Sequence, residues 1–143
     1  MTKAHTATAD AAPAKQHAPY VVAIAEAKGG FMKANSSGLD YQAESLFAMQ
    51  ACQNNDYLMR VATENPTSLK IAIANVAAIG LTLNPVFGFA FLVPRDGKVL
   101  LDISYRGLIK IATDIGSIKW AKAELVYTKD DFRYLGPATS PHH

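Results

Sequence analysis

Two strand-forming runs joined by a short turn most restrict the fold of this 143-residue chain. Val86 to Val93 is β-rich and almost wholly apolar, and Lys98 to Ser104 forms a second such run. Pro-Arg-Asp-Gly lies between them, with Asp-Gly at the tip, a sequence typical of a tight β-hairpin. The pattern predicts adjacent antiparallel strands and disfavours a fold in which parallel strands alternate with helices.

The segments before this hairpin predict helices. Within "NPTSLKIAIANVAAIGLTLNP", apolar residues recur at spacings of three and four, with Thr67 or Ser68 as the N-cap and Gly80 as the stop. Residues 39–62 also favour helix, with a possible break at Asn54 and Asn55. Their expected inward residues are Leu46, Met49, Leu58 and Val61. A shorter helix begins at Tyr20 and is expected to stop at Gly29 and Gly30.

After the hairpin, the pattern predicts a helix from Tyr105 to Ile115 that ends at Gly116. Ile118 to Tyr127 then alternates as a strand would, and a turn at Asp130-Asp131 leads into a further short strand. The predicted class is therefore α+β: N-terminal helices, an antiparallel β-hairpin, a helix and a further β-hairpin. Residues 1–19 predict a disordered tail, and residues 20–143 a single domain.

The composition argues against several function classes. A single cysteine, Cys52, permits no internal disulfide or zinc cluster and indicates a cytosolic setting, and no secretory or membrane-spanning run is present. The sequence lacks a P-loop, a dinucleotide-binding glycine motif and a G-x-S-x-G elbow. The four histidines lie near the two ends of the chain. We therefore expect no cofactor, no metal and no enzymatic activity, with a metal-dependent nuclease using Asp102 and Asp114 as the remaining enzymatic alternative.

The formal charge of +2 is too small to indicate nucleic acid, so the arrangement of the cations matters. Arg106 and Lys110 are four residues apart on one predicted helix and point the same way. Lys119 and Lys122 follow near the start of the next strand, and aromatic residues are interleaved with all four. These residues could line a groove that tracks a nucleic-acid backbone. Alternatively, the cations are simply solvated and the aromatic residues belong to the core.

The residues at the strand-to-helix junction, "SYRG", also have two interpretations. Tyr105 and Arg106 could hold a flat, anionic ligand, whereas Gly107 could serve only for close packing of the helix against the sheet.

From Met59 to Gly116, the order of these motifs resembles the phage RecT family of single-strand annealing proteins. The residues that show it are a helix ending in "GLTLNP", a strand "GFAFLVP", a turn, a strand ending in "SYRG", and a helix ending near a glycine. Ser104 stands where the family usually has a first glycine. "AELVYTKDDFRYLG" resembles the family's next strand pair, which extends the likeness to about residues 40–143.

The resemblance implies ATP-independent binding and annealing of single-stranded DNA in phage-type recombination. It also implies a homo-oligomer, either ring or filament, a possible partner exonuclease, and the cytoplasm of a bacterial or phage-infected cell. Tyr105, Arg106 and Gly107 match the family signature, and Lys110, Lys119 and Lys122 join them as expected DNA-binding residues from the structural reasoning above.

RecT-like chains are typically longer than this one, which ends at "SPHH". We therefore expect the domain to be incomplete at its C-terminus, as a truncation or a fragment. This departure leaves a second hypothesis from another class: a degenerate assembly or protein-interaction module without annealing activity.

Overall fold

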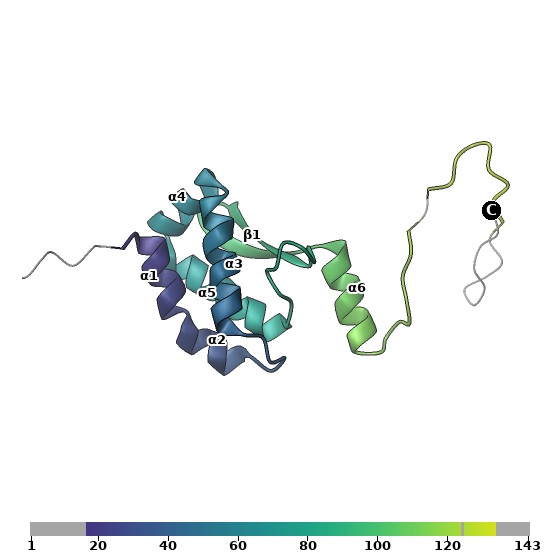
Figure 1. The fold of residues 1–143 in the computed structure, drawn as a ribbon. Helices are drawn as coiled ribbons and strands as arrows, with labels where there is room; N and C mark the ends of the chain where they lie inside the picture. The colour runs from purple at the N-terminus through teal and green to yellow at the C-terminus, as the bar shows by residue number, and fades with distance from the viewer. Residues whose placement is uncertain (1–16, 124, 134–143) are drawn as a thin grey trace, which may run out of the picture. The chain divides into compact units, whose positions relative to one another are not determined.

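A computed structural model describes residues 17–123 and 125–133 (Figure 1). The chain divides into two compact units, Met1–Leu108 and Ile109–His143. The α+β class is confirmed, because helices and one two-stranded antiparallel sheet make up the regular structure of the described residues. The predicted tail, residues 1–19, lies outside them except for its last three residues, and Pro19 already begins the first helix.

The first unit packs helices around α5. The helices before the sheet are α1 (Pro19–Glu26), α2 (Lys28–Ala34), α3 (Tyr41–Gln53), α4 (Asp56–Glu64) and α5 (Pro66–Ile79). α5 contacts α1 and α2 as well as the sheet, so its small and apolar side chains are buried on several sides. The largest fully buried side chains are Phe31, Leu58, Leu69, Ile73, Leu81, Val76, Val99 and Cys52.

The expected helix stop at Gly29 and Gly30 is wrong, since both residues lie inside α2. Tertiary packing is the reason that the helix continues through these glycines. Phe31 in the same helix is fully buried, and α2 packs closely on α5. Burial of such a ring outweighs the cost of about 1 kcal/mol for each helical glycine.

The start of α5 also differs from the prediction. Asn65 is the N-cap, because its Oδ1 accepts a hydrogen bond from the Ser68 amide at 3.2 Å. The Ser68 hydroxyl instead joins the helix to the sheet, accepting from the Val99 amide at 2.9 Å. At the other end, Gly80 is confirmed as the stop, with a left-handed φ of 74°.

The break in the preceding helical region is confirmed: α3 ends at Gln53, and Asn55 caps α4 by accepting from the Leu58 amide at 3.0 Å. Leu58 and Val61 are buried as expected, and Met49 is partly buried. Leu46 is 69% exposed, so its inward assignment is wrong. A helical region that is broken in two has a separate apolar face in each half. A single apolar periodicity fitted to both halves therefore cannot predict correctly which side chains point inward in each.

The hairpin is confirmed as β1 (Ala90–Arg95) paired with β2 (Lys98–Ile103). Asp96 and Gly97 form its two-residue turn with φ of 51° and 68°, the positive values that this turn class requires. Pro94 lies within β1 opposite Val99 rather than in the turn. β1 also begins later than predicted, because residues 84–89 form a loop before the sheet.

The predicted helix after the hairpin is confirmed as α6 (Tyr105–Asp114), with Gly116 at a positive φ behind it. The further β-hairpin is not found in residues 115–123 and 125–133, which contain no strand element and only an isolated β-bridge at Arg133. Trp120 and Leu125 are 64% and 81% exposed, so these residues bury no face that would fix a strand. A turn is present, but it lies earlier than predicted, from Tyr127 to Asp130: the Asp130 amide donates to the Tyr127 carbonyl at 3.0 Å and the Tyr127 amide donates to Asp130 Oδ2 at 2.8 Å. The end of the expected last strand, from residue 134, lies outside the described residues.

No helix in the described part of the chain is both long and apolar enough to cross a membrane.

Candidate nucleic-acid interface

Ser104 fixes the join between β2 and α6. Its hydroxyl donates to the carbonyl oxygen of Gly88 at 2.6 Å and accepts from the Gly107 amide at 3.2 Å. Its own amide donates to the carbonyl of Phe89 at 3.0 Å. Ser104 therefore caps α6 and also ties the helix start to the loop before β1. The two contacts of the hydroxyl group would be lost with a glycine at this position.

Gly107 is a packing residue. A β-carbon at this position would overlap the carbonyl oxygen of Phe89 and lie 2.8 Å from Ile103 Cγ2 and 3.0 Å from Leu81 Cδ1. The approaches to Phe89 and Ile103 are closer than real β-carbons make, so only glycine lets α6 begin here. Of the two readings of Gly107, close packing of the helix against the sheet is the one that the structure supports.

Tyr105 and Arg106 are the exposed residues of the same turn. Tyr105 is 68% exposed, and the Arg106 guanidinium lies 5.8 Å from the centre of its ring. Arg106 Nε donates to the Tyr105 hydroxyl at 3.2 Å, which raises the pKa of the guanidinium. A permanent cation and a flat ring are therefore presented together, which is a combination suited to a phosphate and a neighbouring base.

Of the six predicted interface residues, three belong to each unit. Tyr105, Arg106 and Gly107 belong to the first unit, and Lys110, Lys119 and Lys122 belong to the second. Lys110 donates to Asp114 Oδ2 at 2.8 Å, so a carboxylate one helical turn away already offsets part of its charge. Lys119 and Lys122 are exposed beyond α6. A groove containing all six residues remains a prediction.

A buried carboxylate that no sequence pattern indicated holds the loop between α5 and β1. Glu44 in α3 is 3% exposed, and its two oxygens accept from the Thr82 hydroxyl at 2.5 Å and the Leu83 amide at 2.8 Å. Thr82 in turn accepts from the Asn84 amide at 3.1 Å. The "GLTLNP" motif is thus anchored to a helix nearly forty residues earlier in the chain.

The sequence model of the RecT family matches residues 43–140, which include all but the first two residues of α3, the whole of α4 to α6 and the hairpin. The chain belongs to the RecT family. No curated protein and no solved structure matches it. The RecT match therefore includes both the Glu44 anchor and the Ser104 join.

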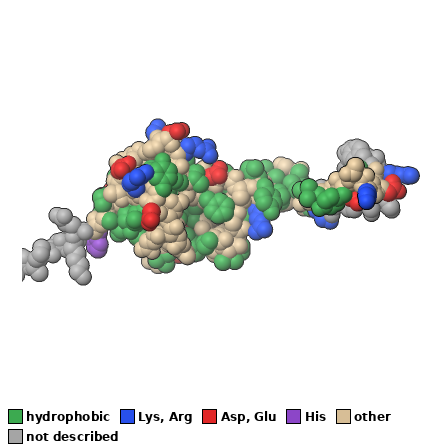
Figure 2. Space-filling view, turned by 90° about the horizontal axis from the view of Figure 1, so that it is seen from above, with side chains coloured by type: hydrophobic (Ala, Val, Ile, Leu, Met, Phe, Trp, Pro, Cys, Tyr) green, Lys and Arg blue, Asp and Glu red, His purple; other side chains and the backbone are tan. Residues whose placement is uncertain are grey.

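Charge is evenly balanced over the part of this RecT-family chain that holds Arg106. Residues 17–108 contain seven Lys and Arg and seven Asp and Glu. On the face drawn in Figure 2, blue and red side chains are interspersed over the helical part and green apolar side chains are exposed among them. Any affinity of this unit for an anionic polymer must therefore come from local groups rather than from net charge.

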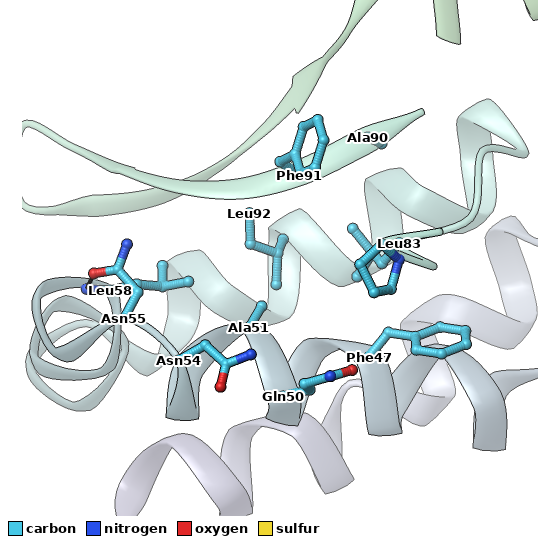
Figure 3. Close-up of a pocket in the computed structure, with 11 residues that line it drawn as sticks. Phe47, Gln50, Ala51, Asn54, Asn55, Leu58, Leu83, Ala90, Phe91 and Leu92 are labelled. Carbon is cyan, nitrogen blue, oxygen red and sulfur yellow. Dashed lines mark hydrogen bonds between the residues drawn. The ribbon is translucent and has the colours of Figure 1, made fainter. Parts of the chain in front are cut away.

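A hollow of about 200 Å³ lies between α3, the loop before β1, and β1. In Figure 3, Leu92 points toward Ala51 across it, whereas Phe91 points away on the other side of the strand. Gln50, Asn54 and Asn55 are its polar lining residues. In the described residues of the chain, no three His, Cys, Asp or Glu side chains are grouped so as to hold a metal ion.

Proposed function

We propose that this RecT-family chain binds single-stranded DNA and promotes the annealing of complementary strands without ATP, as a recombination protein. The observation that supports this most directly is the exposed Tyr105–Arg106 pair at the start of α6. Ser104 and Gly107 fix the backbone on both sides of that pair, so the backbone that carries the ring and the cation is ordered before DNA binds.

Under this proposal Arg106 contacts a phosphate, and Lys110, Lys119 and Lys122 supply further backbone contacts. Such contacts are independent of base sequence, as annealing of arbitrary complementary strands requires. The chain would act as a homo-oligomer on DNA in the cytoplasm of a bacterial or phage-infected cell, alongside a partner exonuclease, with no enzymatic step of its own.

The test is a titration of labelled single-stranded oligonucleotide across a salt series, with a matched pair of variants. Arg60 is the matched control for Arg106, because it too lies against a tyrosine ring: its guanidinium is 5.0 Å from the ring centre of Tyr57 on α4. Arg106→Ala is expected to weaken binding severalfold and to reduce the salt dependence by about one phosphate contact. Arg60→Ala is expected to change neither. Affinity that ignores salt, or equal losses in both variants, would refute the phosphate contact.

Annealing is measured separately, as pairing of two complementary labelled strands without nucleotide. Accelerated pairing that Arg106→Ala slows and Arg60→Ala does not would support the annealing role. Binding without acceleration would limit the function to DNA binding.

A second candidate function is an assembly module without annealing activity. The outer face of the hairpin favours it, since Phe91 and Leu100 are 44% and 40% exposed. Oligomer size measured with and without DNA separates the two functions. Assembly that occurs in the absence of DNA, together with no affinity for DNA, would support the module and contradict the annealing protein.

A further inference from the structure

We propose that Phe87 and Phe89 form a base-stacking platform that belongs to the same DNA site as Tyr105 and Arg106. This inference rests on the proposed single-stranded DNA function and names a ligand contact for it, namely the flat face of a nucleobase. Neither phenylalanine was among the residues expected from the sequence to bind DNA.

The two rings already have the geometry of a stack. Their centroids are 5.5 Å apart and their planes differ by only 9°. Phe87 is 51% exposed, although an isolated phenylalanine gains by burial, and Val86 beside it is 82% exposed. Phe89 is more buried and supports the inner side of the pair. A base that stacks on Phe87 would extend an arrangement of parallel rings that exists without DNA.

The loop that presents these rings is fixed. The amides of Phe87 and Gly88 both donate to the carbonyl of Asn84, at 3.2 and 3.3 Å, and Gly88 has a φ of 61° that closes the turn. Upstream, Asn84 is tied through Thr82 to the buried carboxylate of Glu44. A rigid ring loses little freedom when a base stacks on it, so binding there costs less than ordering a mobile loop.

The same loop is joined to the cation site. Ser104 donates to Gly88, the residue between the two rings, and its amide donates to Phe89. The next two residues along the chain are Tyr105 and Arg106. The aromatic pair and the cation are therefore linked through one residue by hydrogen bonds of 2.6 and 3.0 Å, all within the unit Met1–Leu108.

Charge balance explains why a stacking contribution is needed. With seven cations against seven anions in residues 17–108, this unit has little long-range attraction for DNA. Stacking on aromatic rings is tolerant of base sequence and insensitive to salt, unlike phosphate contacts. The pair thus supplies affinity without selecting one sequence, which is what the annealing of arbitrary strands demands.

The experiment compares a short labelled oligonucleotide with an abasic strand of the same number of phosphates. Phe87→Ala is expected to weaken binding of the base-containing strand about fivefold or more, with an unchanged salt slope, and to leave the abasic strand unaffected. Phe87→Tyr keeps the ring and should bind as the parent chain does. Val86→Ala, which truncates a still more exposed apolar side chain next to Phe87, is the control and should change nothing.

Phe87→Leu is a second variant for the case in which the alanine variant fails to fold. It keeps apolar bulk but removes the aromatic face. It should also lose affinity for the base-containing strand. Failure of the parent chain to bind either strand would refute the proposed DNA function itself. If the parent chain binds but Phe87→Ala and Phe87→Leu bind the base-containing strand equally well, the platform alone is overturned. An equal loss on the abasic strand, or a change of oligomer size without DNA, would likewise overturn it.

Discussion

The carbonyl oxygen of Phe89 occupies the space that a β-carbon on residue 107 would need. Because of this contact, the four residues of "SYRG" have different structural roles. Ser104 and Gly107 determine where the helix begins, and Tyr105 and Arg106 are the residues left exposed by that arrangement.

Replacement of Gly107 by alanine should therefore destabilise the protein by about 2–3 kcal/mol, because the neighbours are backbone and packed side chains that cannot move aside cheaply. The same change at Gly29 is the matched control. Gly29 is also helical, and a β-carbon there would have nothing within 4 Å. Gly29→Ala should stabilise by about 0.5–1 kcal/mol. Urea unfolding of both variants measures the two effects, and effects of the same sign would contradict the packing role.

Glu44→Ala should lower the free energy of unfolding by about 2–3 kcal/mol, since it leaves the buried Leu83 amide without its acceptor. Glu64→Ala removes an exposed carboxylate from α4 and should change stability by no more than about 0.5 kcal/mol. Chemical denaturation at one pH suffices for the comparison. A small effect at position 44 would mean that the loop before β1 is held by other contacts.

Cys52 should be nearly inert in the folded chain. It is fully buried in α3, and burial raises the pKa of its thiol to about 11. At pH 8 only about one thiol in a thousand is then ionised, and the thiolate is the reactive form. A thiol-specific chromogenic reagent should react slowly with the folded protein and rapidly in urea. Fast reaction without denaturant would show that α3 opens readily.

The raised pKa of Cys52 also makes stability depend on pH. The folded-state pKa lies above the ordinary value of 9.0, so the unfolded chain releases this proton first as pH rises. The stabilising contribution is complete below about pH 9 and is lost as the pH approaches about 11. Cys52→Ala should show a shallower loss over that window than the parent chain in unfolding measurements.

Asp114→Asn should strengthen DNA binding by about two- to fivefold at low salt, because it removes the carboxylate 2.8 Å from Lys110. Asp96→Asn changes net charge equally at the hairpin turn, where asparagine accepts the positive φ of 51°. If both variants gain equally, net charge rather than the Lys110 pair explains the effect. Binding curves at two salt concentrations distinguish these outcomes.

The elements that could be predicted from sequence are those with strong local signals. α5 follows from its apolar spacing and from Gly80, and the hairpin follows from Asp96-Gly97 between two apolar runs. The errors lie where long-range packing decides. Gly29 and Gly30 stay helical because Phe31 is buried against the rest of the unit, and Leu46 is exposed although it fits the apolar period. Ile118 to Tyr127 alternates like a strand but has no strand partner among the described residues.

The candidate site was predictable only in part. Sequence pattern pointed to Tyr105 and Arg106, but it could not separate their role from that of Gly107. Phe87 and Phe89 escaped notice because they lie in an apolar run that predicts a buried strand, whereas the strand begins only at Ala90. Glu44 escaped because its partners are nearly forty residues away in the chain.

That separation has a consequence for the order in which the protein folds. The hairpin pairs residues that are neighbours in sequence, whereas the loop that leads into it depends on the long-range contact between Glu44 and Leu83, so we expect this loop to become rigid only after α3 has docked. Closing so long a segment is slow compared with forming a helix or a hairpin. The aromatic loop is thus expected to be among the last parts of the first unit to reach its final shape during refolding.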